Sequence, residues 1–112
     1  MRLDELSAQE QHILCVMVKH MIRRDGVLTD EEISAMSDVA EEMGQDAWRA
    51  AFQPAAMRRT TSREVLEMAG SVERSGVRKR ILAVLSEVAG ADEVAIEEQS
   101  FLDDLATAWK DA

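Results

Sequence analysis

The stretch RRDGVLTDEE, from Arg23 to Glu32, carries the signals for the end of one helix and the start of another. It follows the apolar segment HILCVMVKHMI (residues 12–22), which has the composition of a buried helix. Gly26 accepts the left-handed conformation that commonly ends a helix. Thr29 and Glu32 have the spacing of a capping box, in which each side chain accepts a hydrogen bond from the other residue's backbone N–H. The stretch therefore predicts the corner of a helical hairpin.

The same capping pattern occurs at Ser7 with Glu10 and at Thr61 with Glu64. Between such starts, apolar residues recur at helical spacing, and Gly44 and Pro54 are expected to end the second and third helices. The composition agrees, because 46% of the residues are hydrophobic while the 112-residue chain contains two Phe, no Tyr and one Pro. We expect one compact all-α domain over residues 1–112, of about six to seven helices: about 7–24, 30–43, 45–52, 61–72 and 77–89, and another after residues 90–94.

Two of these helices should be central, because residues 7–24 and 77–89 are apolar on most sides. The second helix has a narrower apolar stripe that predicts one buried face, and the third is expected to be anchored by Trp48 and Phe52. Methionines at helical spacing are interpreted as core residues before they are interpreted as a peptide groove. The stripe of the second helix is Ile33, Met36, Val39, Ala40 and Met43.

An internal duplication is also indicated. Apolar positions of the first helix match those of the fifth at an offset of 67, and the second and sixth helices match at 66. The expected repeats cover about residues 7–44 and 75–110. The matched pairs are Leu14 with Ile81, Met17 with Val84, Val18 with Leu85, Met21 with Val88, Met36 with Leu102, Val39 with Leu105, Ala40 with Ala106, and Met43 with Trp109.

The acidic corner has part of the pattern of a calcium loop. Asp25 and Glu32 would fill the fifth and twelfth positions of an EF-hand, but Met21 and Arg23 would fill the first and third, which require oxygen ligands. The sequence therefore excludes an EF-hand. A carboxylate cluster completed from elsewhere in the fold remains open as a site for calcium, magnesium or a transition metal. Capping and the helix dipole explain the same residues without a metal. The candidate metal ligands are His20, Asp25 and Glu32 in the first repeat and Glu87, Asp92 and Glu98 in the second.

The two corners together resemble a known family. DGVLTDEE after the apolar helix, and VLSEVAGADEVAIEEQSFLDDLA near the end, are similar to the two turns of the TerB-like, tellurite-resistance-associated proteins. The resemblance extends from about Leu6 to Trp109. It implies an all-helical, duplicated, non-enzymatic module of bacterial stress responses, related to a domain of a co-chaperone, that binds metal ions through acidic residues. Glu93, which stands where the family has glycine, is a departure in the second turn.

Charge is distributed unevenly. The chain has a formal net charge of −9, whereas the segment from Arg58 to Arg80 has seven basic and three acidic residues, a local charge of +4. An acidic chain argues against nucleic-acid binding, which requires cationic surface. The basic segment provides candidate contacts to an anionic ligand or an acidic protein partner, although pairing with the chain's own carboxylates explains it too. These candidate partner-binding residues are Arg74, Arg78, Lys79 and Arg80.

Catalysis and membrane insertion have weak support in the sequence. Cys15, the single cysteine, lies in an apolar segment, and His12 lies near a helix start, so neither is a convincing nucleophile or base. The longest uninterrupted apolar run, Ile13 to Val18, is far short of a membrane span. We therefore expect a cytoplasmic, non-enzymatic protein whose partners are other proteins. Two functions stay open: a TerB-like module that binds a divalent cation, and a protein-interaction adaptor whose acidic turns are structural. The sequence does not indicate an oligomeric state.

Overall fold

The computed structural model describes residues 2–23, 30–57, 61–90 and 96–109 and shows six α-helices in them, with no strand. The chain folds into one compact all-α domain, as predicted, with a Cα radius of gyration of 12.7 Å. The helices are α1 (Ala8–Arg23), α2 (Asp30–Met43), α3 (Gln45–Met57), α4 (Ser62–Ala69), α5 (Ser75–Gly90) and α6 (Ile96–Ala108), preceded by the 3₁₀ turn η1 (Leu3–Glu5).

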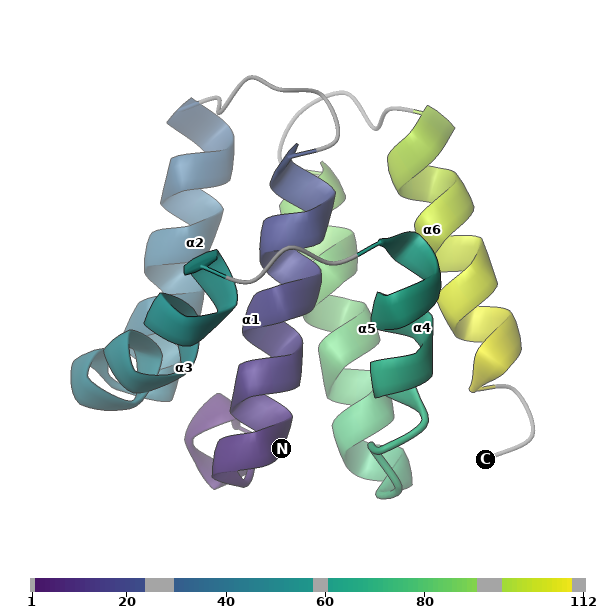
Figure 1. Cartoon of the computed structure of the whole chain (residues 1–112). Coiled ribbons are helices and arrows are strands. Elements are labelled where there is room, and N and C mark those ends of the chain that lie inside the picture. The colour runs from purple at the N-terminus through teal and green to yellow at the C-terminus, as the bar shows by residue number, and fades with distance from the viewer. Residues whose placement is uncertain (1, 24–29, 58–60, 91–95, 110–112) are drawn as a thin grey trace.

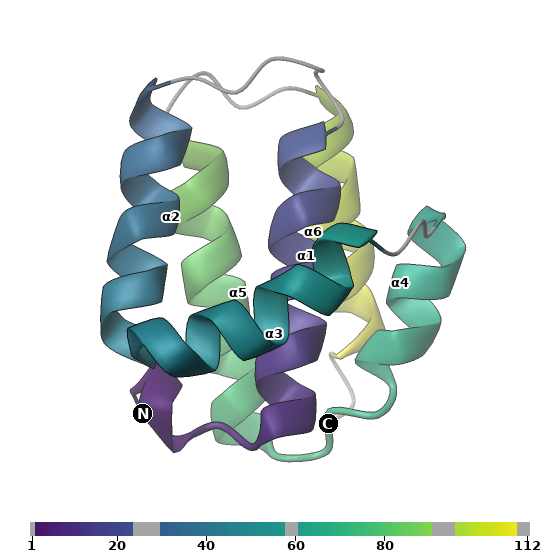
Figure 2. The same ribbon diagram turned by 60° about the vertical axis from the view of Figure 1, so that its left-hand side comes forward.

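Four helices, α1, α2, α5 and α6, lie lengthwise in a bundle (Figure 1). α1 and α5 run in one direction, and α2 and α6 run in the opposite direction. α3 lies across α1, on which it packs most extensively, and also contacts α2 (Figure 2). The short α4 packs against α1 and α6.

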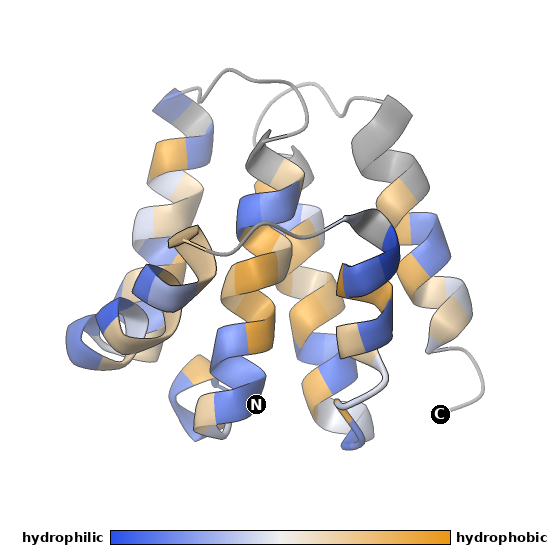
Figure 3. Cartoon of the chain, in the orientation of Figure 1, coloured by the Kyte–Doolittle hydropathy of each residue, from blue (hydrophilic) through white to orange (hydrophobic). Residues whose placement is uncertain are grey.

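The core is built around α1 and α5, as expected from their apolar composition. Figure 3 shows hydrophobic segments gathered along the middle of α1 and on α5. Both helices contribute fully buried side chains, among them Leu14, Met17, Val18, Ile81 and Leu85. α5 packs against α2 and α6 as well as α1. Both helical hairpins of the expected duplication are present, but their common origin stays a prediction.

Capping explains where two helices begin. The Ser7 N–H donates to the Glu10 carboxylate over 2.7 Å, and the Glu10 N–H donates to the Ser7 hydroxyl over 3.2 Å. Thr61 and Glu64 form the same reciprocal pair at the start of α4. These two capping boxes are confirmed, whereas Thr29, the first member of the third, lies outside the described residues.

The expected end of the third helix is wrong. Pro54 lies inside α3, which continues to Met57. Proline costs about 3 kcal/mol in a helix interior, because it cannot donate the usual hydrogen bond. Packing of α3 on α1 opposes that cost, since Ala51 and Ala55 are buried. The ammonium of Lys19 on α1 also donates to the carbonyls of Ala55 and Ala56, over 3.0 and 2.8 Å, near the end of the helix.

A single residue, Gly44, connects α2 to α3. Its φ of +99° lies in a region that favours glycine, and it is positioned to end α2 as predicted. The Gly44 N–H donates to the Ala40 carbonyl over 2.9 Å, and the Gly44 carbonyl accepts from the Trp48 N–H over 2.8 Å. Gly44 therefore belongs to the hydrogen bonding of both helices and sets the sharp angle between them.

Candidate functional site: a groove between α2 and α3

Three of the predicted metal ligands fall within the described side chains. His20 lies on α1, Glu32 in the first turn of α2, and Glu87 near the end of α5. These parts of the three helices lie at the same end of the bundle. Among the described residues, however, no group of three His, Cys, Asp or Glu side chains is arranged to hold a metal ion. The side chains of Asp25, Asp92 and Glu98 lie outside the described part of the structure.

The three described candidates have different surroundings. Glu32 is only 3% exposed, which is unusual for a carboxylate. The His20 ring packs against Phe101 of α6, with 5.1 Å between ring centroids and 58° between planes. Glu87, the counterpart of His20 in the expected duplication, is exposed. Among the candidate metal ligands, His20 and Glu87 are the matched pair with both side chains described, and these two positions differ in burial.

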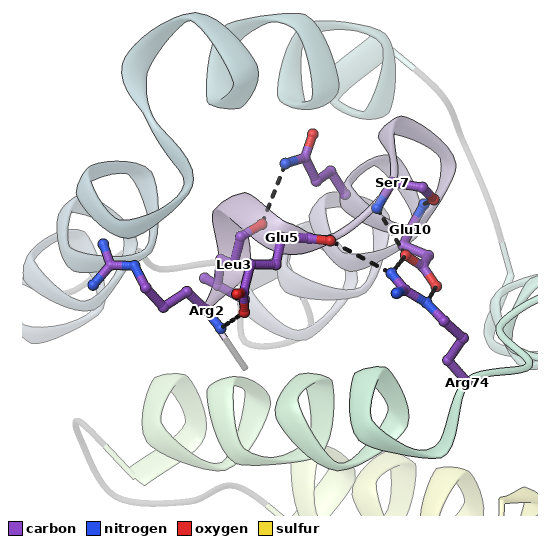
Figure 4. Close-up of polar contacts among 7 residues, drawn as sticks. Arg2, Leu3, Glu5, Ser7, Glu10 and Arg74 are labelled. Atoms are coloured by element: carbon purple, nitrogen blue, oxygen red, sulfur yellow. Dashed lines mark hydrogen bonds and ion pairs between the residues drawn. The ribbon is translucent and has the colours of Figure 1, made fainter.

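Arg74, from the predicted basic surface, pairs with Glu10 of α1 (Figure 4). Its guanidinium donates to both carboxylate oxygens, over 2.6 and 3.1 Å, while the same carboxylate completes the capping box with Ser7. The Arg74 hydrogen bonds, reinforced by the bonds from Ser7, lower the pKa of Glu10 to about 2 even though burial opposes ionisation. Arg74 thus joins the start of α1 to the segment before α5.

Arg80 and Arg78 also bind within the chain. Partial burial opposes ionisation of Glu42 on α2, but hydrogen bonds from Arg80, at 2.7 and 2.9 Å, and from the Leu3 N–H hold its pKa below the usual value. The guanidinium of Arg78 donates to the Val72 carbonyl over 2.5 Å and lies 5.9 Å from the ring centroid of Trp109. Lys79 is exposed. Partner binding by the four predicted basic residues stays a prediction. Three of them, Arg74, Arg78 and Arg80, form contacts within the chain.

The reactive groups named from the sequence lie in unreactive surroundings. Cys15 is 0% exposed, and burial raises the pKa of its thiol to about 12, so the nucleophilic thiolate is disfavoured. The Nδ1 atom of His12 lies 3.3 Å from the Ala51 carbonyl, a contact that joins α1 to α3. This geometry directs the imidazole toward backbone and not toward Cys15.

The described residues form a groove beside the Gly44 corner, where α2 and α3 diverge. Its volume is about 330 Å³. On α2 the lining residues Ile33, Met36, Ser37 and Ala40 follow the i, i+3, i+4, i+7 pattern, so they form one stripe about two turns long. Gln45 and Trp48 line the α3 side.

One apolar side chain at this groove does not face the core as expected, since Ile33 is 46% exposed. Met36 and Trp48 pack against the core but are only partly buried. The Trp48 ring stacks on Phe52 of the same helix, with centroids 4.7 Å apart and 16° between planes. The buried apolar residues of α2 are Val39, Ala40 and Met43.

Local sequence does not predict this arrangement. The apolar positions of α2 form the stripe of a helix with one buried face, yet Val39 and Met43 are buried while Ile33 is exposed. Which part of the stripe remains accessible depends on the direction of α3, and that direction is set by the one-residue link at Gly44.

Comparison of the chain with protein-family models, with curated proteins and with solved structures yields no match. In the part of the chain that the structure describes, no helix combines the length and the apolar character needed to cross a membrane.

Proposed function

We propose that this protein is a non-enzymatic interaction module that binds a helical segment of another protein in the groove between α2 and α3. The observation that carries the proposal is the apolar stripe of Ile33, Met36 and Ala40, which lines a groove of about 330 Å³ beside Trp48 and leaves Ile33 exposed and Met36 partly exposed. Amphipathic helices dock into such grooves with apolar residues at i, i+3, i+4 and i+7. Methionine and tryptophan suit the role, because the first adapts its shape and the second buries a large area.

The surroundings of Cys15 and His12 support a non-catalytic role. A buried thiol with a pKa near 12 and an imidazole directed at a carbonyl do not form a nucleophile–base pair. The groove lining contains Ser37 and Gln45 as its polar side chains and no titratable group. Binding is therefore the chemistry that the groove offers.

Site-specific photo-cross-linking in the native host tests this function. A photoreactive amino acid at Ser37, inside the groove, should capture a partner, and the Ile33→Gln substitution should abolish that capture. The same amino acid at Ser86, an exposed position of α5, serves as the matched control. Equal capture from both positions, or capture unaffected by Ile33→Gln, would refute the groove as the binding surface.

A second candidate function, cation binding by a TerB-like module in a stress response, is favoured by the burial of Glu32. A carboxylate that is 3% exposed at the start of α2 is suited to a ligand or to a structural cap. If a cation binds, calcium, magnesium, manganese or zinc should raise the melting temperature. Glu32→Gln should remove the increase that is due to the first repeat, and Glu87→Gln tests the second repeat in the same way. An unchanged melting temperature with all four ions would eliminate this candidate.

A further inference from the structure

The charges around the groove indicate the chemical class of the partner. α2 contains six acidic and no basic residues in the sequence DEEISAMSDVAEEM. Two of these carboxylates are directed inward: Glu32 is buried, and Glu42 binds Arg80. The exposed acidic side chains with described positions on α2 are Asp30, Asp38 and Glu41.

Two of these carboxylates lie along the outer edge of the groove. Asp30 lies one turn before Ile33, and Glu41 lies one turn after Ser37, so both are next to lining residues on the same side of α2. Asp38 lies about 100° around the helix from Ser37, on a face turned away from the groove. We call Asp30 and Glu41 the acidic rim. Within the described structure neither of the two forms an ion pair.

Basic side chains elsewhere in the molecule are largely engaged. Arg74 and Arg80 bind carboxylates, Arg78 binds a carbonyl beside an indole, and Lys19 donates to the end of α3. On the α3 side of the groove the charged neighbour is Arg49, four residues after Gln45. The α2 edge is therefore acidic and open to an external cation.

We infer that the groove takes a cationic amphipathic helix, with apolar side chains on the stripe and Lys or Arg side chains against the acidic rim. This inference rests on the proposed function, because it specifies the partner of the same groove. Charge complementarity favours this occupant over a second copy of the chain, which carries a formal net charge of −9 and would set one acidic rim against another.

Three synthetic helices test the inference. Each is roughly 18 residues long, enough to form a helix, with the same Leu face and with Lys, Gln or Glu on the polar face. Intrinsic emission of Trp48 reports groove occupancy, since the peptides lack Trp, and a Trp48→Phe variant should lose the signal. We expect the Lys helix to bind most tightly, the Gln helix less tightly and the Glu helix least.

Two double variants remove the same number of negative charges, one in the acidic rim and one elsewhere. They distinguish attraction by the rim from attraction by the overall negative charge of the protein. Asp30→Asn/Glu41→Gln, in the acidic rim, should weaken binding of the Lys helix about fivefold. Glu73→Gln/Asp104→Asn removes two exposed acidic charges on other elements and should leave the affinity nearly unchanged at moderate salt. Circular dichroism checks that both variants fold.

The outcomes distinguish the inference from the proposed function. Equal affinity for the Lys and Gln helices, or equal weakening by the two variants, would overturn the cationic partner while leaving groove binding intact. If no helix changes the Trp48 emission, or if Ile33→Gln and Met57→Gln have the same effect, groove binding itself fails. Met57 is the matched control because it is 88% exposed and does not line the groove.

Discussion

At the scale of single residues, ion pairs and hydrogen bonds to carboxylates join distant parts of this acidic chain. Glu10 accepts hydrogen bonds from Arg74 and from the Ser7 N–H, so one carboxylate caps α1 and joins two distant parts of the chain. The capping role follows from local sequence, because Ser7 and Glu10 are three residues apart. The Arg74 contact could not be read from the sequence, since its two members are 64 residues apart.

Removing this carboxylate should destabilise the fold. We expect Glu10→Gln to lower the free energy of unfolding by about 2 kcal/mol, the value typical of hydrogen bonds to charged groups. Glu67→Gln is the control, because its i, i+4 pair with Arg63 is exposed and should contribute less than about 0.5 kcal/mol. Urea unfolding measures both changes, and equal losses would show that Glu10 has no special role.

Lowering the pH should protonate the same Glu10 carboxylate and so destabilise the fold. The pKa of Glu10 falls from an ordinary 4.5 to about 2 in the folded protein, so its contribution is complete above pH 4.5. That contribution should decline as the pH falls from 4.5 through 2. Urea unfolding at a series of pH values should show a smaller decline for Glu10→Gln than for the native protein. Parallel declines would assign the acid sensitivity to other carboxylates.

At the scale of elements, patterns within a helix were more predictable than contacts between helices. α2 was expected over residues 30–43 and occupies Asp30–Met43, because its apolar stripe and the glycine that follows are both local signals. The extension of α3 beyond Pro54 depends on Lys19 and on packing against α1, which local sequence does not contain. The exposure of Ile33 likewise depends on where α3 lies.

Gly44 controls the angle that opens the groove. We expect Gly44→Ala to lower the free energy of unfolding by about 1–2 kcal/mol, because a φ of +99° strains any residue with a Cβ atom. Gly76→Ala is the matched control, since Gly76 lies in the first turn of α5 at negative φ and alanine is the better helix former. Thermal unfolding of both variants compares the two positions. A neutral Gly44→Ala would mean that the corner tolerates other conformations.

For the whole molecule, α1 is the helix against which several other helices pack. It contacts α3, α4 and α5, and Cys15 near its middle is fully buried with a raised thiol pKa. We expect a thiol reagent to modify Cys15 only as fast as the domain unfolds globally. Labelling should therefore accelerate in Glu10→Gln and in Gly44→Ala in proportion to their loss of stability. Rapid labelling of the native protein under stabilising conditions would contradict this view of the core.

The groove between α2 and α3 is proposed to bind the apolar face of a partner helix. Methyl NMR of the full chain, titrated with the Leu/Lys helix, tests this proposal most directly. We predict shifts at the methyl groups of Ile33 and Met36, while the buried Met17 and the exposed, groove-distant Met57 remain nearly unchanged. Shifts centred on Met57, or no shift at Ile33 and Met36 when the peptide is in excess, would contradict the proposal.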